Sequence, residues 1–472
     1  MKTKKPAKNL DYIFNPSSVA VIGASRDPDS VGQSILKNLV NGCVFQNEYC
    51  KPFPGRIYPI NPFADEIIGV KCYKSLKHVE DEVDLAVVCV PAKLVLGVAK
   101  DCVKKKVKGI IIISSGFAET GEEGKRLQDK ITDVLRKANI PLIGPNCLGV
   151  IRPSSNLNAS FAPSAPPQGN IAFISQSGAL ADSIIDWSIE KRYGFSAVVS
   201  YGNRADLDVH DFIQYFADDE ETKAITLYIE SIEDGKRFME IARHAAKKKP
   251  IIALKAGRTE GGKKAISSHT GSLAGDYKIY EAAFRQSGIM VADTVEELFD
   301  SAKSLANQPP CRSNAVAIVT NGGGCGVLAA DYCEDLGINV VELKKTTIIK
   351  LDKSGVMHPS YSRRNPLDII GDALPERYEV AVNTLLSEPY ISGLIILQTL
   401  QSMTKPLENA RKVIEAHEKH AEKPVICVYM GGKFSRQSIA LLEKHNIPDY
   451  NDPKKAALAM KALVERGKIV KP

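Results

Sequence analysis

The sequence predicts an α/β protein with three consecutive domains, each built on a parallel sheet that helices cover on both faces. Short, continuous apolar runs alternate with amphipathic stretches along nearly the whole chain. Such runs are typical of parallel strands buried on both faces. Two proline-rich segments, 162–169 and 307–313, interrupt this rhythm and read as linkers. We therefore expect domains at residues 1–150, 151–308 and 309–472.

Composition and charge narrow the class of protein. The chain has 472 residues, of which 44% are hydrophobic and 25% charged, as in an ordinary globular protein. The net charge of +7 is mild and the lysines are scattered, which suits a polyanionic small ligand without requiring nucleic acid. No apolar run reaches membrane-spanning length, and the basic N-terminus lacks the apolar core of a signal peptide. We expect a cytoplasmic protein with neither a nucleic-acid nor a membrane partner.

The cysteines and histidines predict no metal site in this chain. Ten cysteines occur without a Cys-x-x-Cys pair, and Cys89 and Cys427 lie within apolar runs. This pattern favours reduced, buried thiols over a disulfide framework or a zinc site. Apart from His269, the histidines lack ligand spacing with one another, except that His417 and His420 lie three residues apart on a charged helix, where a solvated face is favoured over a metal site.

The predicted strands of the first domain all end in polar, Gly or Pro residues. These strands are residues 19–22, 57–60, 85–90, 110–113 and 141–143. Ligands of parallel sheets bind beyond the carboxyl ends of the strands, so these ends predict a nucleotide-type site. The turn Gly23–Ser25 is not Gly-x-Gly-x-x-Gly, and Asn61 stands where an NAD-binding fold has an acid. Ser25 and amides at a helix start would suit a phosphate instead. The alternative is a structural turn beside an empty crevice.

The second domain offers an anion site after its first predicted strand, residues 171–174. Ser175, Gln176, Ser177 and Gly178 occupy the strand-to-helix turn, where backbone N–H groups face an anion at the positive end of the helix dipole. Alternatively, Ser175 is only the N-cap of that helix.

Residues 257–276 read as a long polar loop in which glycines and hydroxyls surround one imidazole, His269. Long loops in α/β domains are often functional, so His269 is a candidate for a mobile, reacting side chain. The alternative is a solvated loop histidine. Glu230 follows the predicted strand 225–229 and could orient the imidazole, whereas the alternative is a solvated strand end.

In the third domain, Thr320-Asn321-Gly322-Gly323-Gly324 follows the strand 315–319. These glycines would allow either the approach of a phosphate or close packing of helix on strand. The sequence leaves both alternatives open.

Four strings occur together in one order, and they carry a resemblance. They are Ile143–Gly149, Ile174–Leu180, Ser267–Ser272 and Thr320–Gly324. With them the chain resembles the NDP-forming acyl-CoA synthetases, in particular the α subunits of ADP-forming acetyl-CoA synthetases, relatives of succinyl-CoA synthetase. The resemblance implies a Rossmann-like CoA-binding domain followed by two flavodoxin-like ligase domains.

The resemblance also implies roles for individual residues. His269 would carry a phosphoryl group, Glu230 would steady it (with Glu233 as a weaker match), and inorganic phosphate would bind at Ser175, Gln176, Ser177 and Gly178. The implied CoA-binding residues are Gly23, Ala24 and Ser25 near the phosphates and, around the thiol and acyl end, Asn61, Pro62, Val90, Pro91, Ser115, Gly116 and Asn146. Phe117 is expected to wall the acyl pocket.

The implied reaction converts acyl-CoA, ADP and phosphate into free acid, ATP and CoA through an acyl phosphate and a phosphohistidine. The family binds ADP/ATP with Mg on an ATP-grasp unit, but the sequence shows no Walker Gly-x-x-x-x-Gly-Lys and no stretch left to hold such a unit. The resemblance therefore implies an ATP-grasp β subunit as partner, in an α2β2 assembly.

Two other functions compete with this interpretation. A serine hydrolase or acyltransferase would use Ser177 and His269, but Ser175 stands where a Gly-x-Ser-x-Gly elbow needs glycine. A non-catalytic CoA- or nucleotide-sensing protein would need only the first domain, which leaves the histidine segment without a purpose.

Overall fold

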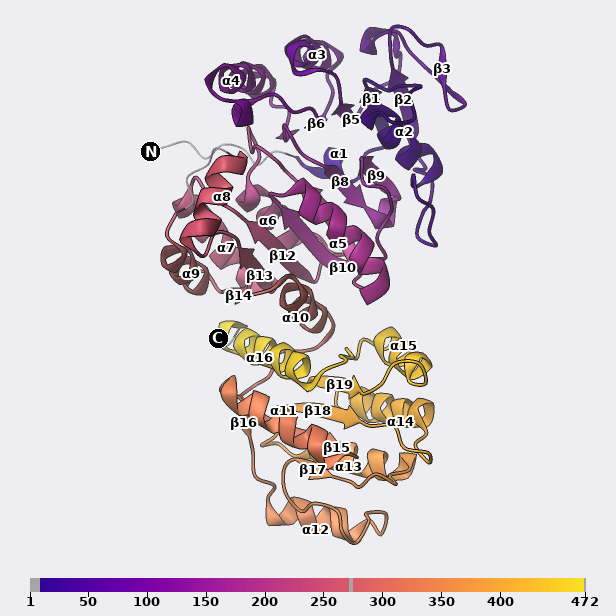
Figure 1. Cartoon of the computed structure of the whole chain (residues 1–472), viewed down its shortest axis with the longest axis vertical. Coiled ribbons are helices and arrows are strands. Elements are labelled where there is room, and N and C mark those ends of the chain that lie inside the picture. The colour runs from indigo at the N-terminus through magenta and orange to yellow at the C-terminus, as the bar shows by residue number, and fades with distance from the viewer. Residues whose placement is uncertain (1–8, 271–274, 471–472) are drawn as a thin grey trace. The chain divides into compact units, whose positions relative to one another are not determined.

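The computed structural model describes residues 9–270 and 275–470, without the side chains of residues 267–270 (Figure 1). The chain forms two compact units, Met1–Val291 and Ala292–Pro472. Each unit is considered by itself below.

The first sheet of the first unit is parallel and has the strand order β2-β1-β5-β6-β7. Its strands are β1 (Ser18–Ile22), β2 (Arg56–Ile60), β5 (Leu85–Val88), β6 (Gly109–Ile112) and β7 (Leu142–Ile143). The other elements here are α1 (Asp11–Phe14), α2 (Val31–Asn41), α3 (Ala92–Lys105), α4 (Glu122–Lys137), the hairpin β3 (Glu66–Ile67) and β4 (Val70–Lys71), and the 3-10 turns η1 (Leu76–His78) and η2 (Ala118–Thr120). The sheet runs outward in both directions from β1 and β5, so its ligand-binding switch point lies between these two strands.

Alternation along the strands divides the first-domain core between two faces. Val19 and Val21 of β1 pack with Ile35 and Leu36 of α2, whereas Ala20 points to the opposite face, toward α3 and α4. Apolar strands buried on both sides are what the continuous runs in the sequence predict.

The second sheet has the order β14-β13-β12-β10-β11-β8-β9. Its strands are β8 (Gly149–Arg152), β9 (Leu157–Ser160), β10 (Gln168–Ser175), β11 (Phe195–Ser200), β12 (Ala224–Ile229), β13 (Ile251–Lys255) and β14 (Ile289–Ala292). Its helices are α5 (Gly178–Lys191), α6 (Val209–Asp218), α7 (Gly235–Lys248), α8 (Glu260–Thr270) and α9 (Tyr277–Gln286), with the 3-10 turn η3 (Pro153–Ser155) in the β8–β9 hairpin. β11, β10, β12 and β13 are parallel, and the hairpin joins β11 antiparallel. One apolar core extends from the α2 face of the first sheet to the α6 and α7 face of the second.

The second unit holds a parallel sheet of order β16-β15-β18-β19, with β17 also paired to β15. Its strands are β15 (Ala315–Thr320), β16 (Asn339–Val340), β17 (Leu367–Asp368), β18 (Gly393–Gln398) and β19 (Val425–Tyr429). Its helices are α10 (Val295–Asn307), α11 (Gly323–Asp335), α12 (Lys345–Lys353), α13 (Pro375–Ser387), α14 (Pro406–Lys419), α15 (Arg436–Lys444) and α16 (Pro453–Val470). Two parallel sheets and one that is parallel apart from the β8–β9 hairpin confirm the predicted fold class.

The expected long loop at residues 257–276 is wrong up to Thr270, because α8 occupies Glu260–Thr270. Thr259 starts the helix: its hydroxyl accepts from Gly262 N at 3.1 Å and its carbonyl from Lys263 N at 2.9 Å. Lys263 also pairs with Glu260 at 2.7 Å. The N-cap threonine followed by an acid is a helix-start signal that the glycines obscured.

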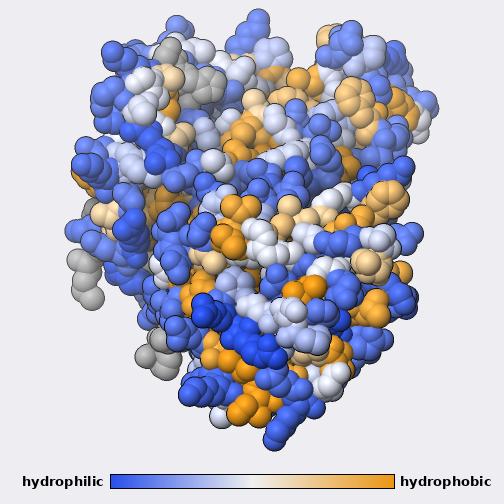
Figure 2. Space-filling view, turned by 60° about the horizontal axis from the view of Figure 1, so that its bottom comes forward, coloured by the Kyte–Doolittle hydropathy of each residue, from blue (hydrophilic) through white to orange (hydrophobic). Residues whose placement is uncertain are grey.

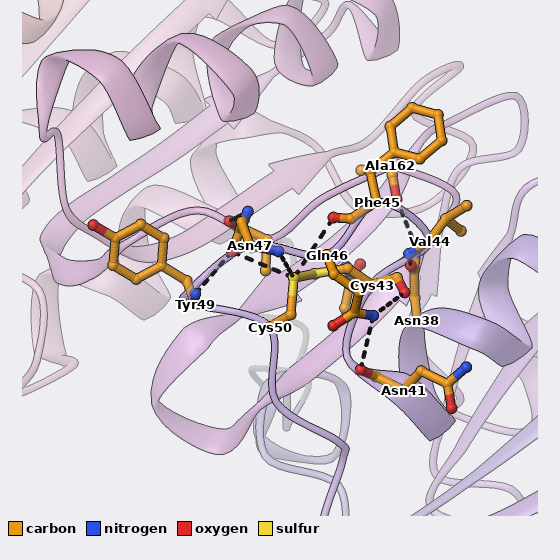
Figure 3. Close-up of a disulfide and its surroundings, with 12 residues drawn as sticks. Asn38, Asn41, Cys43, Val44, Phe45, Gln46, Asn47, Tyr49, Cys50 and Ala162 are labelled. Carbon is orange, nitrogen blue, oxygen red and sulfur yellow. Dashed lines mark hydrogen bonds between the residues drawn. A yellow bond between two sulfur atoms is a disulfide. The ribbon is translucent and has the colours of Figure 1, made fainter.

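The expectation that all the cysteines are reduced is also wrong, because Cys43 and Cys50 form a disulfide in the loop after α2 (Figure 3). The loop folds back so that their Cα atoms lie 5.5 Å apart, within bonding range. The same loop holds the segment after β9: Phe45 N donates to Pro163 O at 2.7 Å, and Asn47 Nδ2 to Ala165 O at 3.0 Å. The other eight cysteines are free.

Within residues 9–270 and 275–470, no helix combines the length and apolar character needed to cross a membrane. The face in Figure 2 mixes hydrophilic residues with small groups of hydrophobic ones.

Candidate functional site

The predicted CoA-binding residues lie at the carboxyl ends of the first sheet, around the switch point. Gly23 follows β1 with φ of +102°, and a Cβ there would lie 3.0 Å from the carbonyl carbon of Cys89 after β5. Only glycine fits a left-handed backbone at so close an approach. The ends of β1 and β5 are therefore in direct contact.

Hydrogen bonds connect the remaining turns of this edge. Asn61 Nδ2 donates to Ala24 O at 2.8 Å, Ser114 Oγ to Val90 O at 2.5 Å, and Asn146 N to Ser114 O at 2.9 Å. The structure thus brings together the turns that follow all five strands.

Two details of this edge differ from expectation. Ser25 does not lie at a helix start: its hydroxyl accepts from Asp27 N at 3.0 Å, and α2 begins later, with Ser30 as its N-cap. The helix still meets the turn, because Gly32 packs directly on Gly23 O. Phe117 is fully buried in the core beneath α3 and α4, so it does not wall an open pocket.

The predicted phosphate loop lies at the carboxyl end of β10 and the start of α5. Ser177, rather than Ser175, is the N-cap, and its hydroxyl accepts from Leu180 N at 3.2 Å. Ser175 Oγ braces the turn by accepting from Ser177 N at 3.1 Å and donating to Ser177 O at 2.8 Å. The next residue, Gly178, lies against Leu148 of the turn after β7: a Cβ built on Gly178 would be 3.4 Å from the Leu148 Cβ. The start of α5, which is suited to binding an anion, therefore lies beside the carboxyl ends of the first sheet, called the first edge below.

Gln176 ties this loop to the end of β12. Its Oε1 accepts from the backbone N–H groups of Glu230 and Ser231, and its Nε2 donates to Ser231 O at 3.0 Å. The amide side chain thereby fixes where Glu230 leaves the sheet.

Glu230 and Glu233 differ in their surroundings. Glu230 is 6% exposed, whereas the Glu233 side chain is 75% exposed and reaches Arg204 at 3.4 Å. A buried carboxylate is the better candidate for orienting an imidazole, since its field is less screened by water.

Lys255 is a candidate site residue near Glu230 that the sequence analysis did not predict. It ends β13 beside Ile229 of β12, and only 1% of it is exposed. Burial lowers the pKa of its ammonium to about 8, although the carboxylate of Glu230 acts in the opposite direction. Its Nζ lies 4.5 Å from the centre of the Tyr280 ring, and the Tyr280 hydroxyl accepts from Ile232 N at 3.1 Å. The sequence shows only a lysine directly after four apolar residues, which is also the pattern of an ordinary strand end.

His269 belongs to α8 by its backbone, but its side chain lies outside the described residues. The contact between His269 and Glu230 therefore stays a prediction.

In the second unit, the turn Thr320–Gly324 supports close packing rather than anion binding. A Cβ at Gly326 would lie 2.8 Å from Thr320 Cγ2, and one at Gly323 would lie 2.9 Å from Asp368 Oδ2. The carboxylate of Asp368 thus faces the turn and opposes an anion there. Among the side chains that the structure describes, no group of His, Cys, Asp and Glu is arranged to hold a metal ion.

Comparison with known domain families assigns each sheet. The CoA binding domain family matches residues 17–153, the succinyl-CoA ligase like flavodoxin domain matches residues 168–305, and the ligase-CoA domain matches residues 316–465. Fold and site together define a CoA-binding ligase of the succinyl-CoA ligase type.

Whole-chain comparisons are more specific. The chain is 46% identical to the α subunit of acetate–CoA ligase [ADP-forming] II of Pyrococcus furiosus over 465 residues, 98% of each chain. It is 48% identical to the acetate–CoA ligase [ADP-forming] of Methanocaldococcus jannaschii, of which it spans 63%. It matches the structure of an acetyl-coenzyme A synthetase of Ca. Korarchaeum cryptofilum in complex with phosphate and ADP, with a TM-score of 0.89, 38% identity and coverage of 98% and 97% of the two chains. The chain belongs to the ADP-forming acetate–CoA ligase family.

Proposed function

We propose that the chain is the α subunit of an ADP-forming acetyl-CoA synthetase, which converts acyl-CoA, ADP and phosphate into acid, ATP and CoA. The alignment over nearly the whole length of the Pyrococcus furiosus α subunit carries this proposal. The contact between the first edge and the phosphate loop, through Leu148 and Gly178, supports it. A thioester bound at one edge would lie beside a phosphate bound at the other.

CoA binds along the first edge. Gly23, Ala24 and Ser25, with the first turn of α2 above them, hold its phosphates. The residues around the thiol and acyl end are Asn61, Pro62, Val90, Pro91, Ser115, Gly116 and Asn146. We assign CoA binding to residues 1–150, the phosphohistidine chemistry to 151–308 and an assembly role to 309–472.

Phosphate binds at Ser175–Gly178, where the positive end of the α5 dipole offsets its charge. A phosphate oxygen attacks the thioester carbonyl, the C–S bond breaks, and CoA leaves as an acyl phosphate forms. His269 then attacks phosphorus and the carboxylic acid leaves. Glu230 holds the other ring nitrogen and offsets the charge of the phosphohistidine.

The phosphohistidine passes its phosphoryl group to ADP on a partner. We assign this partner as an ATP-grasp β subunit that carries ADP/ATP and Mg, in an α2β2 assembly. The Pyrococcus furiosus relative supports a separate partner chain, because its name describes it as an α subunit. We also propose a cytoplasmic location, which the eight free cysteines favour and against which the Cys43–Cys50 disulfide counts.

The competing functions lose their support. The Ser177 hydroxyl caps α5 instead of standing in a nucleophile elbow, and the relatives are ligases. A sensing protein would not need the second sheet with its phosphate loop.

The test is His269→Ala in the chain reconstituted with its partner. We expect loss of ³²P labelling from γ-labelled ATP and loss of ATP formation, because no other group would carry the phosphoryl. The control is His244→Ala, at an exposed histidine on α7 whose Nδ1 contacts Glu240 O at 2.8 Å. Undiminished labelling of the His269 variant would refute the assignment.

A further inference from the structure

The loop between β11 and α6, residues 201–208, contacts both the proposed CoA-binding edge of the first sheet and the proposed phosphate loop. Asn203 N donates to Pro145 O at 2.9 Å, and Gly202 leaves no room for a Cβ against the carbonyls of Pro145 and Asn146. Gly202 has φ of +52° and Arg204 of +58°. A left-handed arginine is disfavoured, and such backbone persists where the surroundings fix it, often at functional sites.

The Asn203 side chain holds two first-domain turns at once. Its Nδ2 donates to Glu119 Oε2 at 2.5 Å and to Gln128 Oε1 at 3.1 Å, and its Oδ1 accepts from Asn146 Nδ2 at 3.3 Å. All the hydrogen-bonding capacity of this amide but one lone pair is therefore committed to the first domain.

Glu119, which accepts from Asn203, also accepts hydrogen bonds from the backbone of the turn after β6. Its Oε1 accepts from Gly116 N at 2.6 Å and from Phe117 N at 3.1 Å. Burial alone would raise the pKa of Glu119, but the hydrogen bonds from Asn203 and these backbone amides outweigh it, so the pKa is lowered. The carboxylate is ionised in the neutral range and acts as a fixed acceptor.

The next residue in the loop, Arg204, bonds to the backbone beside the phosphate loop. Arg204 Nη1 donates to Ser231 O at 2.8 Å, the carbonyl that also accepts from Gln176 Nε2. The Arg204 side chain is 7% exposed. Hydrogen bonds therefore connect Gly116 through Glu119 to Asn203, and they connect its chain neighbour Arg204 through Ser231 O to Gln176 of the phosphate loop.

We propose that Asn203 is a positioning residue that holds the turns at Gly116 and Asn146 in register with the phosphate loop, so that the thioester carbonyl meets the attacking phosphate. This inference rests on the proposed function. Asn203 itself touches no reacting atom, and it acts through Glu119 and Asn146.

Two assays on the reconstituted complex separate this role from folding. The first follows CoA release from acetyl-CoA with arsenate in place of phosphate, which reports the thioester step. The second follows ³²P transfer from ATP to the histidine, which does not use the first-domain turns. Asn203→Asp places a carboxylate against Glu119, and we expect arsenolysis to fall about tenfold or more through displaced turns. Labelling should stay within about twofold of the wild type.

A second substitution provides the rescue. In Glu119→Gln with Asn203→Asp, the glutamine still accepts from Gly116 N and now donates to the new carboxylate, which still accepts from Asn146. We expect arsenolysis to return to within about threefold of the wild type. Asn451→Asp and Glu123→Gln, both at exposed positions, are the matched controls.

The outcomes are distinct. Unchanged arsenolysis in Asn203→Asp, a parallel fall in both assays, or failure of the double variant to recover would each overturn the positioning role. A wild-type complex that neither releases CoA nor becomes labelled would refute the proposed function instead.

Discussion

The second and third sheets share one hydrogen-bonded framework at their carboxyl ends. In each, the hydroxyl that ends one strand, β10 or β15, forms hydrogen bonds with the backbone two residues on: Ser175 with Ser177 at 2.8 and 3.1 Å, and Thr320 with Gly322 at 2.9 and 3.0 Å. In each, the next residue is an amide that reaches the strand across the switch point. Gln176 accepts from Glu230 N, and Asn321 accepts from Thr399 N at 2.7 Å.

The difference between the two edges is charge. Where Gln176 meets Glu230, with Lys255 on the adjacent strand, Asn321 meets the neutral Thr399 and Gln401. Hydroxyl and amide are what this fold needs to close its switch point, so they do not by themselves identify a reactive site. The buried acid and cation distinguish the second edge, which supports the proposal that the phosphoryl chemistry takes place there.

Glu230→Gln tests this comparison with the largest expected effect. It keeps the shape and removes the charge that would offset a phosphohistidine, so we expect labelling of the chain from ATP to fall about a hundredfold or more. Glu233→Gln, on the same loop, should lower labelling less than about fivefold because its side chain is largely solvated. Equal losses in the two variants would remove the distinction drawn from burial.

Asp449 in the third domain is a buried acid away from the proposed reactive edge, and its raised pKa makes folding stability depend on pH. Burial raises the pKa of Asp449 to about 8, although Tyr429 N and Lys303 act against it. In the unfolded chain the carboxyl ionises near pH 4, so the folded form alone keeps its proton between about pH 4 and 8. Folding stability is therefore lost progressively as pH rises over that range.

We expect Asp449→Asn to remove this slope. Its Tm should exceed that of the wild type by a margin that grows from pH 5 to pH 8.5, reaching about 5 °C or more. Asp331→Asn, on the exposed face of α11, is the control and should give no such trend. A margin that stays flat or shrinks with pH would show that Asp449 is ionised in the fold.

Much of this architecture follows from the sequence, because strand burial and turn chemistry are local. The apolar runs gave the strands, and the Gly, Ser and Asn residues after them gave both edges. Lys255 escaped because a lysine after an apolar run looks like a strand end until Tyr280 covers it. Asn203 escaped because its partners Glu119 and Asn146 lie 84 and 57 residues away in the chain. Contacts of that range are set by how two domains meet, which no local pattern encodes.

The smallest expected effect concerns the framework that the two edges share. Gln176→Ala leaves the backbone N–H groups of Glu230 and Ser231 without their acceptor, and Asn321→Ala does the same to Thr399 N. A buried donor without a partner costs about 1–3 kcal/mol, so each variant should lower the free energy of unfolding by about that amount.

The two variants should nevertheless differ in their response to phosphate. Added phosphate should stabilise the wild type and Asn321→Ala alike, because the second edge is intact in both, and should stabilise Gln176→Ala less. Denaturant titrations with and without phosphate measure both quantities. If phosphate protects Gln176→Ala fully and Asn321→Ala poorly, the anion binds at the third sheet, and the assignment of the reactive edge is reversed.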